Sequence, residues 1–193
     1  MEQTVPELIQ RFVNGDQQAF AELVRRYQKK LYSVAYRMLG NHLDADEVVQ
    51  ESFVRVYRRR RELRNVTNFT SFLIRIATNY SIDLLRKRKS HAVVTDDPGS
   101  LPGDVQLFLS GRVPTPSDHH TNRVIMEEIK RALEELPTKQ RITTILHDIE
   151  GYSKSEVAAI MECPEATVRS NLHIARTKLR KILKKRLANK EQK

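Results

Sequence analysis

Apolar residues recur at spacings of three and four along most of the chain, a period that predicts α-helices. The clearest stretch covers residues 16–39, where Asp16 is suited to cap the start and Gly40 to end the helix in a left-handed turn. Further helices are predicted over residues 6–13, 44–60 and 68–89. No long stretch alternates between apolar and polar residues with a period of two, so strands are not expected. The first part of the chain therefore predicts a small helical bundle.

The last third of the chain is divided more sharply. Pro137 separates helices predicted over residues 122–136 and 138–150, the second with Ile142, Ile145, Leu146 and Ile149 facing inward. The segment Ser153-Lys-Ser-Glu156 has the form of a capping box, which opens a short helix ending near Met161. After a turn at Glu162-Cys163, Pro164 suits the first turn of a long helix that runs towards Leu187.

A short helix, a tight turn and a second amphipathic helix together form the pattern of a helix-turn-helix. Small Ala158 suits the contact between the two helices, and Val168 suits the anchor of the second one. The predicted exposed face carries Thr167, Arg169, Ser170, His173 and Arg176, followed by a run of lysines and arginines. The hydrogen-bonding groups at the start of this helix favour contacts with base edges. The cations that follow them favour contacts with phosphates. A solvated helix in an ordinary bundle is the alternative interpretation.

Residues 91–120 differ in composition from both flanks. They hold four of the seven prolines and three of the six glycines, and their net charge is −3. The flanking residues 1–90 and 121–193 carry net charges of +7 and +6. Such a segment buries too little apolar area to offset its ordering entropy, so we predict a flexible acidic linker. Its apolar patch Val105–Leu109 is a possible docking point or a loop cluster. We predict an all-α protein with two small helical domains joined by this linker.

The overall charge narrows the class of function. The 193 residues carry a formal charge of +10, which favours polyanionic partners. The start lacks the pattern of a signal peptide and no apolar run reaches membrane-spanning length, so we expect a cytoplasmic protein without membrane insertion. The single Cys excludes an intramolecular disulfide, and His119-His120 lacks ligands at metal-site spacing. Without a catalytic motif we expect no enzyme activity, no cofactor and no metal.

Three stretches of the sequence resemble the extracytoplasmic-function (ECF) group of the bacterial sigma-70 family. DQQAFAELVRRYQKKLYSVAYRML is similar to the opening helix of region 2. DADEVVQESFVRVYRRRREL and NFTSFLIRIATNYSIDLLRKRK are similar to the rest of that region. LEELPTKQRITTILHDIEGYSKSEVAAIMECPEATVRSNLHIARTKLRKIL is similar to region 4. The resemblance implies a factor that binds core RNA polymerase, recognises the minus-ten and minus-thirty-five promoter elements and aids DNA melting.

The resemblance implies that the helix predicted over residues 44–60 docks on the clamp helices of core RNA polymerase. It also implies that the protein contacts the flap of the polymerase. Its candidate polymerase-binding residues are Asp44, Glu47, Gln50, Glu51, Phe53 and Val54. An acidic and polar face with an apolar neighbour is reasonable chemistry for such an interface. Asp44 and Asp46 are also explained by the helix dipole alone. The family usually has Asp where this chain has Glu47.

For the minus-ten element, the resemblance implies a loop over residues 64–68 that holds an extruded base of the non-template strand. The candidate residues are Arg64, Asn65, Thr67, Asn68, Arg75, Asn79, Arg86, Lys87 and Arg88. Asn79 is the candidate for hydrogen bonds to that base. The candidates for contacts with phosphates are Arg75, Arg86, Lys87 and Arg88. An unpartnered surface residue is the alternative for Asn79, and charge complementarity at a helix end is the alternative for residues 86–89. Residues 58–61 could contact the polymerase, contact phosphates or serve only solubility, and the sequence does not choose among these roles.

For the minus-thirty-five element, the resemblance implies that the second domain reads duplex DNA through the major groove. The candidates for base edges or adjacent phosphates are Arg169, Ser170 and His173, and the candidates for the DNA backbone are Thr167 and Arg176. Asn171 and Ile174 stand where the family often has Arg, and Glu162 occupies a turn position usually held by Gly. A left-handed conformation at that position would cost about 1 kcal/mol. The family also implies an anti-sigma partner. The alternatives are a self-sufficient helix-turn-helix repressor or activator and a nucleoid protein that binds by charge alone.

Overall fold

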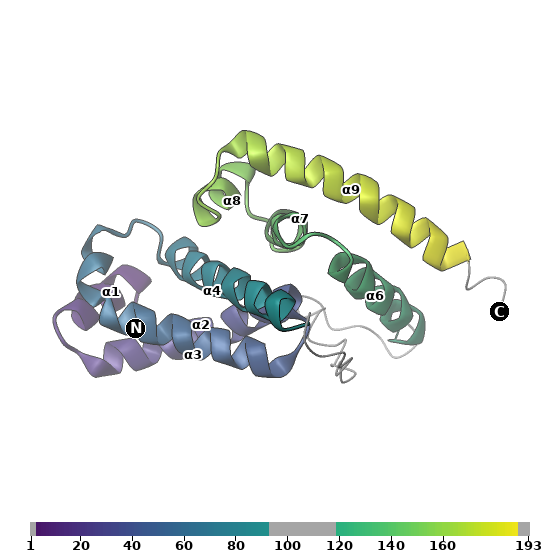
Figure 1. Ribbon diagram of the computed structural model, residues 1–193. Helices are drawn as coiled ribbons and strands as arrows, with labels where there is room; N and C mark the ends of the chain where they lie inside the picture. Colours follow the sequence, from purple (N-terminus) through teal and green to yellow (C-terminus); the bar gives the residue numbers. More distant parts are fainter. Residues whose placement is uncertain (1–2, 93–118, 189–193) are drawn as a thin grey trace.

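The computed structural model describes residues 3–92 and 119–188, and these contain helices and no strands (Figure 1). The first domain, residues 3–92, comprises α1 (Val5–Val13), α2 (Gln17–Leu39), α3 (His42–Arg58), the 3₁₀ turn η1 (Arg60–Asn65) and α4 (Phe69–Ala92). The second domain, residues 119–188, comprises α6 (His119–Glu134), α7 (Thr138–Thr144), the π-helical turn η2 (Ile145–Ile149), α8 (Lys154–Ile160) and α9 (Glu165–Ala188). The predicted all-α class is confirmed.

Side-chain caps fix several helix ends. The Asp16 carboxylate accepts hydrogen bonds from the backbone amides of Gln18 and Ala19, and Gly40 ends α2 with φ 81°. The Ser153–Glu156 capping box opens α8 as predicted. α3 begins two residues before the predicted start, because the side chain of Asn41 accepts from the amide of Asp44 and caps the helix there.

The predicted linker is shorter at both ends than residues 91–120. α4 continues to Ala92 and α6 begins at His119, so two residues at each end are helical. The remainder of that segment, including the patch Val105–Leu109, lies outside the described residues.

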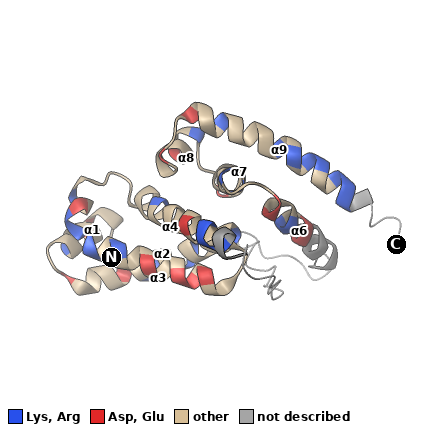
Figure 2. Ribbon diagram, in the orientation of Figure 1, with Lys and Arg blue, Asp and Glu red and all other residues tan. Residues whose placement is uncertain are grey.

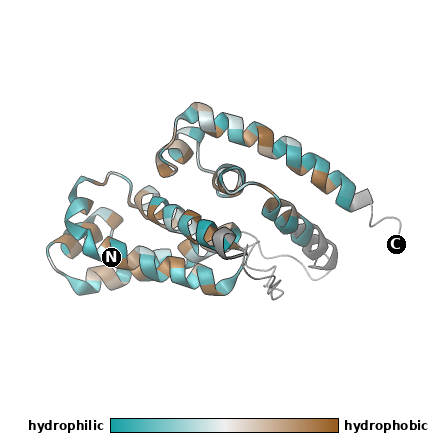
Figure 3. Cartoon of the chain, viewed as in Figure 1, coloured by the Kyte–Doolittle hydropathy of each residue, from teal (hydrophilic) through white to brown (hydrophobic). Residues whose placement is uncertain are grey.

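The core of the first domain forms where α2, α3 and α4 lie against one another. Figure 3 shows apolar and polar residues alternating around these helices, as amphipathic packing requires. An aromatic cluster joins α1 to this core: Phe12 stacks on Phe20 at a centroid distance of 4.7 Å, and Phe20 meets Tyr57 edge-on at 5.3 Å. Leu23, Val34 and Val48 are fully buried beneath.

In the second domain α9 packs across α6, α7 and α8 (Figure 1). The sequence predicts that the inward-facing residues of α9 are Val168, Leu172, Ala175, Leu179, Ile182 and Leu183. The first three are buried and the last three are half-buried. Ile149 was predicted to face inward, and that prediction is wrong: its side chain is 38% exposed. The amide of Glu150 bonds to the carbonyl of Ile145 rather than to that of Leu146. This π-helical bond inserts one extra residue into the turn, which rotates Ile149 off the buried face.

The two domains pack together, with α7 and α8 lying against α4, and their buried residues form one continuous cluster. The sequence predicts that the inward-facing residues of α4 are Phe69, Phe72, Leu73, Ile76, Ala77, Tyr80 and Leu84. Ile74 and Thr78 fall outside this apolar stripe, and both are buried. The guanidinium of Arg37 on α2 pairs with the carboxylate of Glu150, and these side chains are only 9% and 10% exposed. α4 is therefore covered on a second side by the helix-turn-helix.

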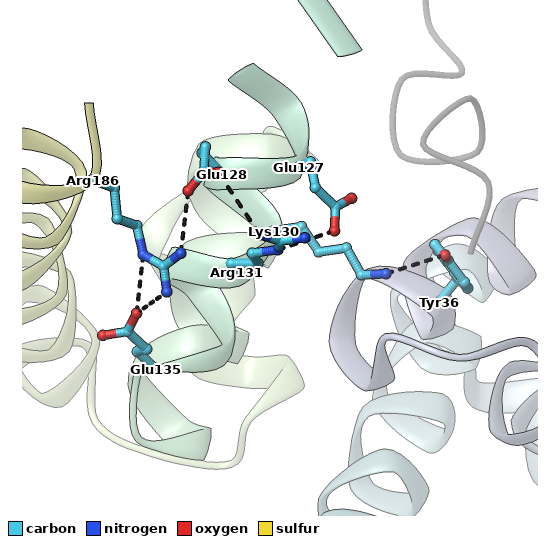
Figure 4. Close-up of polar contacts among 7 residues, drawn as sticks. All are labelled: Tyr36, Glu127, Glu128, Lys130, Arg131, Glu135 and Arg186. Carbon is cyan, nitrogen blue, oxygen red and sulfur yellow. Dashed lines mark hydrogen bonds and ion pairs between the residues drawn. The ribbon is translucent and has the colours of Figure 1, made fainter. Parts of the chain in front are cut away.

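Polar contacts of α6 extend this interface (Figure 4). Lys130 is buried and reaches the hydroxyl of Tyr36 on α2, with 3.4 Å between nitrogen and oxygen. On its other side α6 is tied to α9, since Arg186 donates to Glu128 and Glu135. The ammonium nitrogen of Lys30 in the first domain lies 5.7 Å from the centre of the Tyr152 ring. Burial raises the pKa of the Tyr152 hydroxyl to about 12.

Candidate polymerase and nucleic-acid interfaces

One face of α3 points to solvent and combines apolar and polar side chains. Leu43, Glu47, Gln50 and Val54 are spaced by four, three and four residues, which places them on one side of a helix. All four are exposed, and Leu43 is 84% exposed. We call these four residues the α3 stripe. Sequence reasoning missed Leu43, although its position one turn before Glu47 was a usable signal.

The other candidate polymerase-binding residues are buried or already paired within the protein. Phe53 is 6% exposed and meets the ring of Phe20 edge-on, so it belongs to the core rather than to an exposed surface. The expectation that it contributes to the docking face is corrected on this ground. Glu51 accepts from Arg55 at 2.7 Å, and Asp44 pairs with Arg88 of α4 at 2.5 Å.

Glu47 is held in place by α4. The hydroxyl of Tyr80 donates to its carboxylate at 2.5 Å, and the guanidinium of Arg55 lies 4.8 Å from the Tyr80 ring centre. The hydrogen bond to Glu47 raises the pKa of the Tyr80 hydroxyl to about 12, because the neutral phenol is the donor. A polar side chain of the α3 stripe is thus oriented before any partner arrives.

A cavity of about 630 Å³, which we call the loop cavity, lies between α1 and the loop that joins η1 to α4. Arg64, Thr67 and Asn68 line it together with the rings of Tyr27 and Phe69. Asn68 also caps α4, because its side chain accepts from the amide of Ser71 at 3.0 Å. The cavity thus joins aromatic surface to polar groups that stand in a fixed loop.

The structure does not bring every predicted minus-ten residue to this cavity. Asn65 is exposed on the same loop but is not among the lining residues. Asn79 is half-buried on α4, and at a rise of about 1.5 Å per residue it lies roughly 15 Å from the loop. Arg75, Asn79 and Arg86 are spaced by four and seven residues and share one face of α4. Lys87 is exposed beside them.

Arg75 is engaged by the second domain. Its guanidinium lies 3.7 Å from the carboxylate of Glu162 and 5.6 Å from the ring centre of Phe72. Arg86 pairs with Asp83 at 3.4 Å. Arg88 pairs with Asp44 of α3 at 2.5 Å. Three of the four predicted phosphate-binding cations of α4 therefore meet carboxylates in the packed molecule, and the Arg75 pair crosses between domains.

The helix-turn-helix has the packing that its sequence predicts. Val157, Ile160, Val168 and Leu172 are buried among α8, α9 and their neighbours. The five predicted minus-thirty-five residues, Thr167, Arg169, Ser170, His173 and Arg176, are all exposed on α9. Within this set Arg169 donates to Glu165 at 2.5 Å, and Arg176 donates to Asp148 at 2.6 Å. Figure 2 shows the basic residues continuing along the far half of α9.

The turn before α9 adopts the left-handed conformation that the sequence suggested. Glu162 has φ 50°, and it is the one non-glycine residue with positive φ in the part of the chain that the structure describes. The amide of Cys163 closes the turn on the carbonyl of Ala158 at 3.0 Å. A residue with a Cβ is strained there, since the left-handed region costs non-glycine residues about 1 kcal/mol.

The described residues contain neither a membrane-spanning helix nor a metal-binding cluster. Among residues 3–92 and 119–188, no helix is both long and apolar enough to cross a membrane. Within the same ranges, no group of three or more His, Cys, Asp or Glu is arranged to hold a metal ion.

The chain is similar to known proteins of one family. Residues 23–91 match the family model described as Sigma-70 region 2, and residues 126–179 match the one described as Sigma-70, region 4. The chain is 33% identical to the ECF RNA polymerase sigma factor SigW of Bacillus subtilis over 95% of its length and 99% of that protein. It is 34% identical to the ECF RNA polymerase sigma-E factor of Escherichia coli K12, over 88% of each chain.

Solved structures show the same fold. The structure of CnrH in complex with the cytosolic domain of CnrY matches with a TM-score of 0.65 and 25% identity, covering 92% of this chain and 95% of that one. The sigma factor RpoE of Bartonella quintana, crystallised with the anti-sigma factor NepR, matches with a TM-score of 0.63 and 24% identity. It covers 86% of this chain and 96% of that one.

Proposed function

This chain belongs to the ECF sigma factors of the sigma-70 family, and from that premise we propose how its surfaces divide the work of initiation. The first domain binds core RNA polymerase and the melted minus-ten element, and the second domain reads the minus-thirty-five element as duplex. RNA synthesis belongs to the polymerase, and this chain contributes binding alone. That role places it in the cytoplasm with the polymerase and the chromosome.

The α3 stripe is the proposed contact with the clamp helices of the polymerase. Exposed Leu43 and Val54 supply apolar area, and Glu47 and Gln50 supply hydrogen-bonding groups beside it. An apolar centre with a polar rim is typical of helix-on-helix interfaces. Leu43 carries most weight here, because a leucine that is 84% exposed gains little from its own fold and much from a partner.

The loop cavity is the proposed seat of an extruded minus-ten base. Tyr27 and Phe69 offer aromatic surface, and Arg64, Thr67 and Asn68 offer polar groups to the edge of a base. The shared face of Arg75, Asn79 and Arg86 extends from there along α4 and suits the phosphates of the displaced strand. Asn79 lies too far along α4 for the same base that the loop holds, so we assign it to a neighbouring nucleotide.

For the minus-thirty-five element, α9 is the proposed recognition helix. Ser170 and His173 are exposed in its N-terminal half and carry no ion pair among the described residues, which leaves them available to base edges. Arg169 and Arg176 flank them and suit adjacent phosphates. We also propose an anti-sigma partner, a class of protein that the related factor from Bartonella quintana binds.

Run-off transcription with sigma-free core polymerase on a library of start sites tests the proposal. We expect initiation that requires this chain and that selects particular sequences at both elements. Tight, selective duplex binding without polymerase would instead identify a helix-turn-helix repressor or activator. Salt-sensitive binding without sequence preference would identify a nucleoid protein.

A matched pair of variants tests the α3 stripe. Leu43→Ala is expected to weaken association with core polymerase about fivefold or more, since truncating a central interface residue costs about 1 kcal/mol or more. Ile149→Ala removes an exposed aliphatic side chain of similar size from the second domain, and is expected to leave that affinity unchanged. Equal effects of the two variants would remove the α3 stripe from the proposal.

A further inference from the structure

A second cavity, of about 490 Å³, lies beside the loop cavity and is lined by arginines. Its lining comprises Val13, Asn14 and Gly15 at the turn from α1 to α2, and Arg60, Arg61 and Arg64 of η1. We call it the arginine cavity. The 3₁₀ geometry of η1 contributes to the grouping, because side chains three apart, such as those of Arg61 and Arg64, eclipse one another.

These three arginines differ from most others in the first domain. Apart from Arg58, every other arginine in residues 3–92 has a carboxylate within ion-pair distance. None of the three in the arginine cavity has such a partner in the described parts of the chain. Arg60 contacts the ring of Tyr57 instead, at 5.7 Å.

Nearby carboxylates do not neutralise the cavity, because each already has a cation. Asp16 follows the turn that lines the cavity, but it accepts two hydrogen bonds from Arg11, at 2.6 and 2.8 Å. Glu62 lies within η1 and pairs with Arg59 at 2.7 Å. Three guanidinium groups at one concave surface thus keep their charge, and like charges repel unless an anion joins them. The charge of this cavity therefore favours an anion.

The neighbouring cavity indicates which anion. Val13, Asn14 and Arg64 line both cavities, so the two are adjacent. The loop cavity offers aromatic and polar surface, and the arginine cavity offers planar donors that match phosphate oxygens. A nucleotide of single-stranded DNA presents the same two parts, a base and an anionic phosphodiester.

We infer that the arginine cavity seats the phosphodiester next to the nucleotide whose base enters the loop cavity, with Arg60 and Arg61 as its main ligands. This inference rests on the proposed function, and it assigns a role to two arginines that the family resemblance left unassigned. The contact is independent of sequence, since a phosphate carries no base identity. It anchors the strand at the point where the base leaves the stack.

The test uses the complex of the full chain with core polymerase and a fluorescent single-stranded oligonucleotide that carries the non-template start-site sequence. The dissociation constant is measured over a series of salt concentrations. Arg61→Gln is compared with Arg58→Gln, which removes the same charge from an exposed, unpaired arginine three residues away that does not line the cavity. Arg60→Gln/Arg61→Gln and Arg61→Lys complete the series.

Removing one arginine–phosphate interaction is expected to reduce the slope of log affinity against log salt by about 0.7. Arg61→Gln should show this reduction, the double variant should show at least as much, and Arg61→Lys should retain most of the slope. Arg58→Gln should match the wild type.

Equal slopes for Arg61→Gln and Arg58→Gln would overturn the inference while leaving the proposed function intact. Loss of polymerase association by Arg61→Gln without DNA would also overturn it, since the occupant would then be protein. If the wild-type complex shows no preference for start-site strands, the proposed function fails and the inference fails with it. Circular dichroism of each variant confirms that a changed slope does not reflect unfolding.

Discussion

Replacing Arg37 by Met should separate the two domains rather than unfold either one. In the packed molecule the Arg37 guanidinium neutralises the Glu150 carboxylate, and the two side chains are 9% and 10% exposed. Removing the cation leaves a buried carboxylate without its cation across the interface. Breaking such a pair from one side costs about 3–5 kcal/mol, because the remaining charge is desolvated.

The molecule can avoid this cost by opening. Glu150 regains water once the second domain leaves α2, while the buried residues within each domain stay in place. A change of about 3 kcal/mol shifts the equilibrium between packed and open forms more than a hundredfold. The predicted outcome is therefore a more extended molecule with folded domains.

Small-angle X-ray scattering measures the outcome directly. A compact chain of 193 residues has a radius of gyration of about 16 Å. Arg37→Met should raise this value by several ångströms without changing the helical circular dichroism signal. Adding Glu150→Gln should return part of the compactness, since no charge is then left buried. Arg25→Met, which removes an exposed arginine from the same helix, should have no effect.

An unchanged radius together with a loss of several kcal/mol in urea unfolding would refute this reasoning, since the chain would then unfold as one unit. No change in either measurement would show that the pair is absent in solution.

Three further outcomes are expected. Glu162→Gly should be more stable than Glu162→Ala by about 1 kcal/mol, because Ala keeps a Cβ at φ 50°; thermal unfolding compares the two, and the reverse order would contradict the left-handed turn. Ser153→Ala should destabilise the second domain by about 1 kcal/mol. Hydrogen bonds from Ser153 lower the pKa of the Glu156 carboxyl below its usual value, so the wild type should lose this contribution as pH falls through that lowered pKa, and the variant should show a weaker acid dependence in urea titrations. Ile74→Ala should cost about 2–5 kcal/mol in urea unfolding, as for a buried aliphatic side chain, and a loss below about 1 kcal/mol would contradict its burial.

Local features of this protein could be predicted from the sequence because they depend on neighbouring residues. Asp16, Gly40 and Ser153 end or begin helices through hydrogen bonds and dihedral angles within a few residues. For Glu162 the signal came from the family resemblance, since this turn position is usually held by Gly, and its φ is 50°. The π-helical turn that exposes Ile149 left no such signal, since it depends on one shifted backbone bond.

Features that depend on contacts between distant parts of the chain could not be predicted from the sequence. Ile74 and Thr78 were left outside the buried face of α4, because helical periodicity identifies one apolar stripe and the second domain buries another side. The arginine cavity combines the turn after α1 with η1, two segments that lie more than forty residues apart in the sequence.

The contact between Arg75 and Glu162 connects local sequence features with the packing of the two domains. The sequence alone gives Arg75 a role at phosphates and Glu162 a role in a turn, while the structure places their charged groups 3.7 Å apart across the domain interface. Their side chains are 37% and 63% exposed, so the pair contributes at most about 1 kcal/mol. It cannot hold the domains together by itself, and the buried residues and the Arg37–Glu150 pair must do so. Once these part, a DNA phosphate can replace Glu162 beside Arg75 at little cost, and the proposed strand-binding face of α4 becomes complete.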